Sequence, residues 1–473
     1  MACTTLHASG NQNAIDIEDI YGKNSNFSGI EKITDDNIEI YKDVVKDLFS
    51  WVQENKENDN IKNLFAKRLA AATRQYNKIY IKKSLLVFIY RKMIAANEIE
   101  TSLDFWRLIQ KSPSRNISGI TSVTLLTSPF PDGQSYSCKH DCFYCPNEPG
   151  MPRSYLRKEP AVARADRNEF DATRQTIDRL DSLLMCGHEI DKLEFIIEGG
   201  TYTEYPVDYL ERFHRDIVYS CNTYFDKEKR DPLTIHEEVE FNRTARVRII
   251  GICIETRPDA IDSEWLHRFR QWGVTRVQLG VQHLDDDILK KVNRGHTVQD
   301  AVDAVNFLKD NCFKVDIHMM PDLPNSTPSI DKDMFKKLFT TDFMRVDQVK
   351  IYPCEITPWT KIQKWYQEGK YRPYSEVCER DLFDVVKYAM EICPPYVRLP
   401  RVIRDIPTSY IQGGNAYPNL RQMLYQEMEK EGKYSMDIRN RECGRHPKYK
   451  VENADYVTRE YSYVTYNNNR IAT

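Results

Sequence analysis

Hydrophobic residues recur along this chain with two different spacings. Over residues 38–55 and 61–97 they fall at steps of three and four, which predicts amphipathic helices. After the polar, proline-containing segment 111–118, the pattern changes to short apolar runs separated by helical stretches. The runs that we expect to be β-strands are 119–128, 193–198, 247–255, 276–281, 315–320 and 348–352.

Short strands that alternate with helices are typical of a parallel sheet with right-handed crossover connections. We therefore predict an α/β protein whose sheet is either open or curled into a partial (βα) barrel. One connecting helix is expected over 297–311, where Thr297 and Asp300 resemble a capping signal. The predicted divisions are a helical region over 1–112, the barrel over 113–400 and a C-terminal extension over 401–473.

Composition narrows the class of protein. The 473 residues are 41% hydrophobic and 29% charged, with a net charge of -3, which fits a globular protein of about three domains. No apolar run is long enough to span a membrane, and the N-terminus does not resemble a secretory signal. We expect no membrane partner and a cytoplasmic location, with the nucleus as the other default.

Positive charge is concentrated near the N-terminus. Residues 60–97 contain nine Lys or Arg residues and no Asp or Glu, and they interleave Tyr76, Tyr80 and Tyr90. Cations mixed with aromatic rings suit a phosphate backbone with exposed bases. A solvated helix face with acidic partners elsewhere in the fold is the alternative.

Three of the twelve cysteines lie within eight residues, as Cys138, Cys142 and Cys145. A structural zinc site takes four ligands, and the nearest fourth candidate, His140, lies too close in the same loop. Three thiolates suit a 4Fe–4S cluster with one open iron, which could bind the amino and carboxylate groups of S-adenosylmethionine. A zinc loop or buried thiols remain the alternatives.

Two glycines follow the second expected strand. Gly199 and Gly200, with Thr201, stand at its carboxyl end, where ligands bind in parallel sheets. Adjacent glycines let the backbone approach a ligand closely, here the methionine part of the cofactor, although most Gly-Gly pairs are simple turns.

The cysteine spacing, with Tyr144 before the third cysteine, resembles the signature loop of the radical S-adenosylmethionine superfamily. Further segments resemble the catalytic subunit of the Elongator complex, in that family's order, across roughly residues 113–446. They are DCFYCP, DKLEFIIEGGTY, IGICIETRPD, QLGVQHLDDDIL, NRGHTV, HMMPDLPN, VKIYP, RDIP and DIRNREC. HMMPDLPN and NRGHT are more specific than the cysteine motif, which many radical enzymes share.

The resemblance implies roles for individual residues. The three cysteines hold the cluster, and Lys192 contacts acetyl-coenzyme A and is the expected catalytic residue; without the family match it would be an ordinary surface cation. The residues expected to bind cofactor are Tyr144, Lys192, Gly199, Gly200, Thr201, Arg257 and Gln282. Structural pairing within the barrel is an equal alternative for Arg257 and Gln282, and His296 and His318 are expected to be structural.

The reaction implied by the resemblance converts the wobble uridine (U34) of transfer RNA to 5-carboxymethyluridine, with acetyl-coenzyme A as donor. A deoxyadenosyl radical would take hydrogen from the acetyl methyl group, the carbon radical would add to C5, and hydrolysis would free the product. The expected partner is transfer RNA, which the basic segment would dock, and Elongator-like subunits are the further partners that the resemblance implies.

Two departures from the family are expected. Its members continue into an acetyltransferase domain, whereas this sequence ends about thirty residues after Cys443, past a segment (DYVTREYSYV) that resembles the approach to that domain. The first two cysteines are also separated by only three residues, fewer than in eukaryotic members. The alternatives are a radical enzyme with another substrate and a silent transfer-RNA-binding scaffold.

Overall fold

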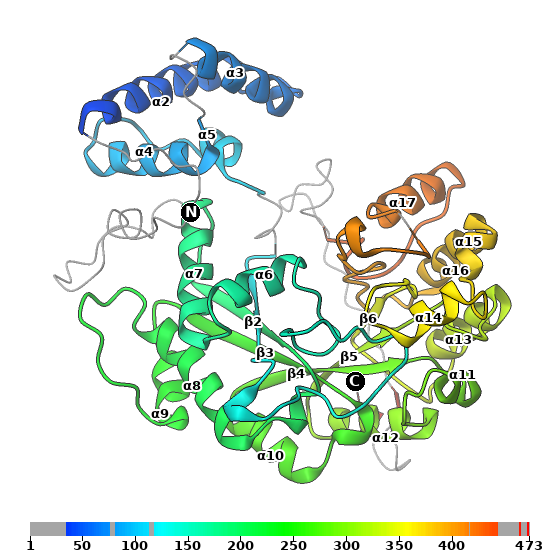
Figure 1. Ribbon diagram of the computed structural model, residues 1–473. Helices are drawn as coiled ribbons and strands as arrows, with labels where there is room; N and C mark the ends of the chain where they lie inside the picture. The colour runs from blue at the N-terminus through cyan, green and yellow to red at the C-terminus, as the bar shows by residue number, and fades with distance from the viewer. Residues whose placement is uncertain are drawn as a thin grey trace.

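The structure is a computed structural model that describes residues 35–75, 81–112, 118–415 and 417–442, and the short strand pair β7 (Tyr463–Val464) and β8 (Ile471–Ala472). Its first part is helical, as predicted. The helices are α2 (Asp35–Asn55), α3 (Ile61–Gln75), α4 (Lys83–Ala95) and α5 (Leu103–Ile109). They pack around their own hydrophobic core and stand together at one end of the molecule (Figure 1).

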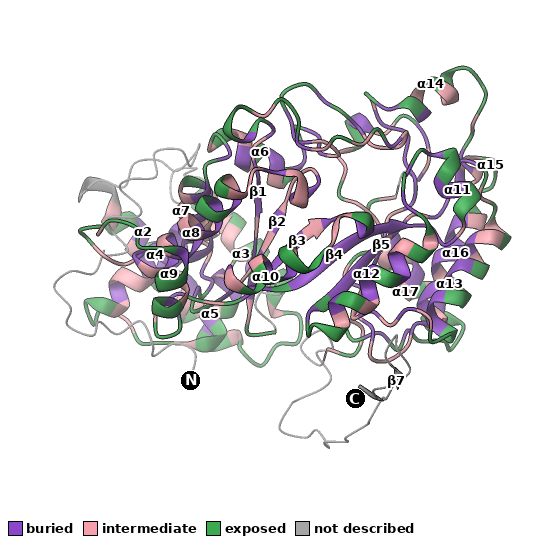
Figure 2. Cartoon of the chain, turned by 90° about the horizontal axis from the view of Figure 1, so that it is seen from below, coloured by how far each residue is buried: buried purple, intermediate pink, exposed green. Residues whose placement is uncertain are grey.

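All six runs predicted to be strands form one parallel sheet, with the strands in chain order. They are β1 (Thr121–Leu126), β2 (Lys192–Glu198), β3 (Arg248–Thr256), β4 (Val274–Gln282), β5 (Lys314–Met319) and β6 (Gln348–Ile351). The sheet curls into a half-barrel with helices on its outer face (Figures 1 and 2), which confirms the predicted partial barrel.

The helices between and after the strands include the predicted one, α12, which begins after Thr297 with a capping box formed with Asp300. The helices from β1 to β4 are α6 (Pro160–Arg167), α7 (Ala172–Met185), α8 (Val207–Asn222), α9 (Ile235–Asn242) and α10 (Ser263–Gln271). Those after β4 are α11 (Asp286–Lys291), α12 (Val298–Asp310), α13 (Pro328–Thr340), α14 (Lys361–Gln367), α15 (Tyr374–Val377), α16 (Glu379–Ile392) and α17 (Leu420–Lys430). Short 3-10 helices occur at η2 (Pro131–Gly133), η3 (Tyr202–Glu204), η4 (Pro258–Ala260) and η5 (Thr408–Tyr410).

The main hydrophobic core lies between the sheet and its outer helices. It continues into the C-terminal part of the chain, where Leu420, Leu424 and Met428 on α17 are buried in it. The concave side of the sheet is polar by contrast, because Gln278, Asp316 and Lys350 are buried there. A polar interior that opens at the strand ends is suited to holding ligands.

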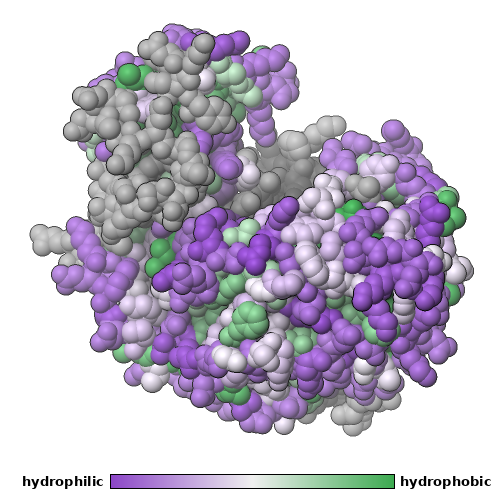
Figure 3. Space-filling model, viewed as in Figure 1, coloured by the Kyte–Doolittle hydropathy of each residue, from purple (hydrophilic) through white to green (hydrophobic). Residues whose placement is uncertain are grey.

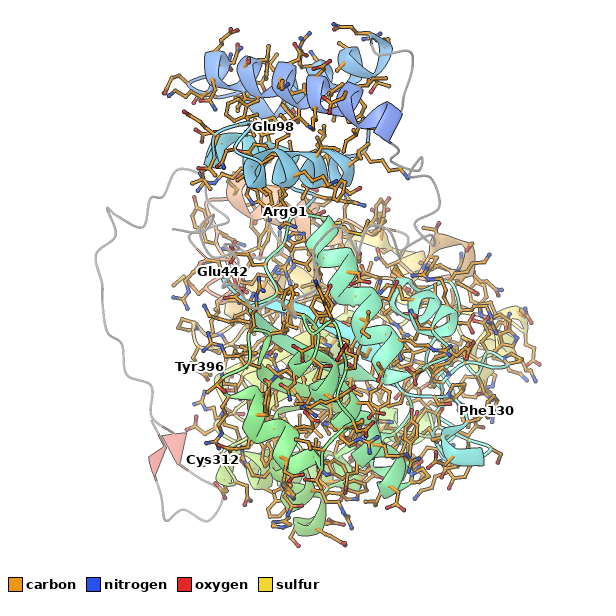
Figure 4. All side chains as sticks on the ribbon, turned by 90° about the vertical axis from the view of Figure 1, so that its left-hand side faces the viewer. Arg91, Glu98, Phe130, Cys312, Tyr396 and Glu442 are labelled. Carbon is orange, nitrogen blue, oxygen red and sulfur yellow. The ribbon has the colours of Figure 1, made fainter. Side chains whose placement is uncertain are left out.

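The N-terminal helices are attached to the C-terminal end of α7. Arg91 donates a hydrogen bond to the carbonyl of Leu184 at 3.0 Å, and Gln110 donates one to that of Gly187 at 3.0 Å. Figure 4 shows Arg91 at this junction. At least part of the basic segment therefore has a structural role.

One expectation for the basic segment is wrong. Tyr90 is fully buried, and its hydroxyl donates to the carbonyl of Glu100, so it is a core residue and cannot stack on a nucleobase. The aromatic spacing could not reveal this, because helix α4 buries nearly every residue of its central turns. Tyr76, Lys78 and Tyr80 lie outside the described residues.

The visible face of the molecule is mostly hydrophilic, with scattered hydrophobic side chains (Figure 3). Among the described residues, no helix is both long and apolar enough to cross a bilayer.

Candidate functional site

The three clustered cysteines lie in the loop after β1, at the carboxyl edge of the sheet. Cys142 is buried, and Cys138 and Cys145 are half-buried. All three line one cavity of about 110 Å³, which we call the cysteine cavity. Its walls also include the predicted residues Tyr144, Gly199, Gly200, Thr201, Arg257 and Gln282. The fold therefore brings together every predicted site residue except Lys192.

The glycine pair is needed for close packing against the cysteine loop. A Cβ atom on Gly199 would lie 1.9 Å from Oγ1 of Thr127, and one on Gly200 would lie 1.8 Å from the carbonyl oxygen of Ser137. The next residue, Thr201, donates its backbone N–H to that same carbonyl at 2.9 Å. The glycines thus dock the loop onto the end of β2, and their contact with a cofactor stays a prediction.

Two buried arginines surround Cys142. Arg294 approaches Sγ at 3.4 Å and Arg257 at 3.7 Å. Burial alone would raise the pKa of Cys142, but the positive charges of Arg294 and Arg257 outweigh it and lower the pKa. The site therefore stabilises a thiolate at this position.

The other two thiols are in less polar surroundings. Burial raises the pKa of Cys138, although Thr201 donates a hydrogen bond from Oγ1 to its sulfur at 3.0 Å. Burial also raises the pKa of Cys145 to about 11. Such thiols are protonated at neutral pH and lose their protons when a metal centre binds.

Arg257 and Gln282 combine structural and site contacts. Arg257 forms an ion pair with Asp259 at 2.8 Å while it reaches the sulfur of Cys142. Gln282 ends β4 with a φ of 75°, and its carbonyl accepts a hydrogen bond from Met320 at 2.7 Å. The structural pairing raised as the alternative is therefore present for both residues, and binding of a cofactor stays a prediction.

The histidines near the site have different surroundings. His296 contacts the carbonyl of Gly280 at 3.2 Å, and burial lowers its pKa to about 4, as expected of a structural histidine. His140 pairs with Glu204 at 3.0 Å. His318 lines the cysteine cavity beside Gln278, and burial lowers its pKa to about 3, so it is neutral.

Lys192 is not part of this constellation. It begins β2, whereas Gly199 follows the end of that strand, so about 20 Å of extended chain separates the two. Its side chain is 48% exposed and lies 3.7 Å from Asp191. It borders a separate cavity of about 320 Å³ with Arg243 and Arg248. Its predicted roles stay predictions, and its position does not support contact with atoms that react at the cysteine cavity.

A second cavity of about 130 Å³, the inner cavity, adjoins the cysteine cavity. The two cavities share the lining residues Tyr144, Ser154, Tyr155, Glu255, Gln282 and His318. The Tyr155 hydroxyl donates to Glu255 at 2.5 Å, and Lys350 lies 3.5 Å from the same carboxylate. Burial would raise the pKa of Glu255, but the charge of Lys350 and the hydrogen bond from Tyr155 lower it overall, so this carboxylate is ionised.

Sequence reasoning missed two residues of this site. Arg294 falls within the NRGHTV segment, whose specificity was noted without a role for the arginine. Glu355 lines the inner cavity and belongs to none of the segments that carried the resemblance. The motif could have indicated Arg294, but Cys142 is 152 positions away, and only the fold brings them together.

Comparisons with known proteins agree with this geometry. Residues 135–334 match the family model for the Radical SAM superfamily, and residues 346–430 match the one for the Radical_SAM C-terminal domain. The chain is 37% identical to "tRNA uridine(34) acetyltransferase" of Methanocaldococcus infernus, over 72% of this chain and 62% of that protein. It is 38% identical to the protein of that name from Dehalococcoides mccartyi, over 71% of this chain and 69% of that protein.

Elongator complex protein 3 of Mus musculus is 33% identical, over 75% of this chain and 64% of that protein. The solved structure of Elp3 from Methanocaldococcus infernus with an N-terminal deletion is 33% identical. It superposes with a TM-score of 0.57, over 68% of this chain and 65% of that one. The chain belongs to the Elongator complex protein 3 family.

Membership in the Elongator complex protein 3 family and the superfamily match imply a 4Fe–4S cluster and S-adenosylmethionine. The residues present fit these groups, because three thiols share one cavity and two buried arginines offset the negative charge of thiolates. Within the described ranges, no group of three or more His, Cys, Asp or Glu side chains is placed to hold a single metal ion. In a cluster each thiolate binds a different iron.

The chain spans 62% to 69% of the length of the three curated relatives named above. The activity, substrates and partners of those whole proteins are therefore carried to this chain only as proposals.

Proposed function

We propose that this member of the Elongator complex protein 3 family modifies the wobble uridine of transfer RNA and forms 5-carboxymethyluridine with acetyl-coenzyme A as donor. The observation that carries the proposal is the convergence of Cys138, Cys142 and Cys145 on one cavity at the carboxyl edge of the sheet. Relatives named for a reaction at uridine 34 of transfer RNA support this choice of substrate.

The chain's own residues would prepare the site for its cofactors. Arg257 and Arg294 favour the ionised form of Cys142, and Thr201 orients Cys138 through a hydrogen bond. When bound, the cluster and S-adenosylmethionine supply a carbon radical that removes hydrogen from a substrate carbon. The inner cavity adjoins the cysteine cavity and would hold the substrate next to that radical.

Lys192, which is proposed to contact acetyl-coenzyme A, lies apart from the cysteine cavity. Lys192, Arg243 and Arg248 border a cavity at the opposite edge of the sheet, where cations would attract phosphate groups. A contact with Lys192 would therefore involve a part of the coenzyme remote from its acetyl group. If the uridine were modified with a different donor, that donor would take the place of acetyl-coenzyme A in the proposal.

Transfer RNA is the proposed partner, and Elongator-like subunits are proposed as further partners by analogy with the named relatives. The exposed cations of α3, which are Lys62, Lys67 and Arg74, are candidates for contact with the phosphate backbone. The target base must leave its stack to reach a buried cavity, and an anticodon loop permits this more readily than a duplex does.

The proposal is tested with the full chain reconstituted with iron and sulfide without oxygen. We expect about four irons per chain, reductive cleavage of S-adenosylmethionine, and 5-carboxymethyluridine at position 34 by mass spectrometry of transfer RNA treated with acetyl-coenzyme A. Cys142→Ala should lose all three, whereas Cys312→Ala, at an exposed cysteine far from the site in sequence, should keep them.

Two other results would contradict the proposal. Deoxyadenosine without modified uridine would indicate a radical enzyme with another substrate. Binding of transfer RNA with neither iron nor deoxyadenosine would indicate a scaffold.

A further inference from the structure

We propose that Glu355 is the residue that pairs with the hydrogen-bonding edge of the target uracil, inside the inner cavity. This inference rests on the proposed function and adds to it the way in which the base is held. Glu355 follows β6 and is only 7% exposed.

The backbone around Glu355 is fixed from both sides. Cys354 donates its N–H to the carbonyl of Pro321 at 2.9 Å, and Ile356 donates to the carbonyl of Gly413 at 2.9 Å. Ile356 and Gly413 form an isolated antiparallel bridge, and Gly414 packs so closely that a Cβ there would lie 3.3 Å from Cα of Glu355. The position of the carboxyl group is therefore set by the fold before any ligand binds.

Within the part of the chain that the structure describes, the carboxyl group of Glu355 has no hydrogen-bond partner. Neither of its oxygens makes a hydrogen bond to any described residue, although both are buried. A buried polar group without a partner destabilises a protein, so such a group in a native structure calls for an explanation. The group lines a cavity that adjoins the proposed radical site, which makes a bound ligand the natural partner.

The surroundings of Glu355 keep it neutral. Burial raises its pKa to about 8; the charge of Arg404 opposes this and that of Glu159 adds to it. Arg404 is itself occupied by an ion pair with Glu159 at 2.8 Å. The other titratable groups that line the inner cavity are Tyr144, Tyr155, Glu198, Glu255, His318, Tyr352 and Arg401. At neutral pH Glu355 therefore offers one O–H donor and one carbonyl acceptor.

The inner cavity as a whole suits a neutral planar ring. Glu355 is neutral and the pKa of Glu198 is about 7, so only Glu159 and Glu255 are left to offset the two arginines. The lining therefore carries little net charge, and nothing in it favours a phosphate group over a neutral ring. Tyrosine rings and His318 provide flat faces, and His318 packs edge-on against Tyr352 with ring centres 5.3 Å apart. Rings of this kind stack on unpaired bases in proteins that recognise single-stranded RNA.

Uracil matches the hydrogen-bonding groups of Glu355. Its edge presents an N3–H donor beside a carbonyl acceptor. The O–H of neutral Glu355 donates to that carbonyl, and the carbonyl oxygen of Glu355 accepts from N3–H. Ionised Glu355 would lose the first of these bonds, so binding of the base should weaken as pH rises through about 8.

The test compares Glu355→Gln, Glu355→Leu and wild type as reconstituted full chains, with Glu368→Gln at an exposed glutamate as the matched control. The readout is modified uridine formed per deoxyadenosine released. The amide of Glu355→Gln keeps a donor and an acceptor, so this ratio should stay within about threefold of wild type at pH 7. Glu355→Leu should lower the ratio about 10- to 100-fold while deoxyadenosine still forms, because the base loses both hydrogen bonds.

The pH profile separates binding of the base from a structural role. We compare the yield of modified uridine per deoxyadenosine in wild type with that in Glu355→Gln at each pH. Between pH 7 and 9 the wild-type yield, relative to that of Glu355→Gln, should fall about tenfold as Glu355 ionises. Burial also raises the pKa of Glu198, to about 7. Glu198 is present in both proteins, so its titration affects both yields equally and does not change the comparison.

Each remaining outcome gives a clear answer. Identical pH profiles for wild type and Glu355→Gln, or an unchanged ratio in Glu355→Leu, would overturn the role of Glu355 while the proposed function stands. Failure of the wild type itself to modify uridine would overturn the proposed function and this inference with it.

Discussion

Gly200→Ala should reduce iron binding although it changes none of the cysteines. The added Cβ would lie 1.8 Å from the carbonyl oxygen of Ser137 and 2.3 Å from its carbon, whereas real Cβ contacts essentially never fall below 3.0 Å. The Ser137 carbonyl must therefore retreat by more than 1 Å. The 2.9 Å hydrogen bond that Thr201 donates to it would then be broken.

The cost follows from these two effects. A lost hydrogen bond contributes about 1 kcal/mol and overpacking about 1–3 kcal/mol, so the free energy of unfolding should fall by about 2–4 kcal/mol. Cys138 follows Ser137 in the chain and receives the Thr201 hydroxyl at 3.0 Å, so its sulfur should shift with the loop. We expect a Tm lower by about 2–7 °C, because the unfolding entropy of so long a chain is large, and less than half of the wild-type iron.

The assays are thermal denaturation by circular dichroism and iron per chain after reconstitution without oxygen. Gly369→Ala is the matched control, because a Cβ there meets nothing within 4 Å, although its φ of +69° makes alanine strained. The control should lose about 1 kcal/mol of stability and keep its full iron content. Full iron and an unchanged Tm in Gly200→Ala would refute the reasoning that the loop is docked through this contact.

Three further predictions test other parts of the molecule. Arg294→Leu should reduce iron per chain several-fold more than Arg294→Lys, because lysine keeps the charge near Cys142; equal losses would contradict an electrostatic role. Burial raises the pKa of Asp316 to about 7 from about 4 in the unfolded chain, so the folded state binds the proton more tightly and loses stability as pH rises from 4 to 7. Between pH 4 and 7 the free energy of unfolding of Asp316→Asn, measured by urea denaturation, should therefore rise by up to about 4 kcal/mol relative to that of wild type. Unfolding free energies that change with pH in the same way in both proteins would contradict this. Replacing Lys62, Lys67 and Arg74 together with alanine should weaken binding of transfer RNA and lower the slope of log affinity against log salt by about 3, whereas an unchanged slope would exclude these contacts.

The architecture was predictable because it is encoded locally. Each strand appears in the sequence as a short apolar run, and a buried parallel sheet requires such runs whatever surrounds them. The helix after Thr297 is likewise predictable from its own capping residues, Thr297 and Asp300. The order and direction of the strands then follow from the rule that crossover connections are right-handed.

The site residues were predictable only where they belong to a local sequence motif. The spacing of the cysteines is local, so their convergence on one cavity was expected. The contact of Arg294 with Cys142 joins residues 152 positions apart, and no periodicity reveals it. The glycine pair was correctly placed at a strand end, but the atoms that demand glycine belong to Thr127 and Ser137, which lie far away in sequence.

The distribution of charge at the carboxyl edge of the sheet links the two cavities to the proposed reaction. Arginines surround Cys142, where thiolates and a cluster with net negative charge need compensation. The inner cavity has no such excess of positive charge, because Glu159 and Glu255 offset its two arginines. A nucleotide could therefore place its neutral base inside while its phosphates stay outside, toward the bulk solvent. The same division fits the buried carboxyl group of Glu355, which has no hydrogen-bond partner among the described residues: the base that enters would supply the missing hydrogen bonds.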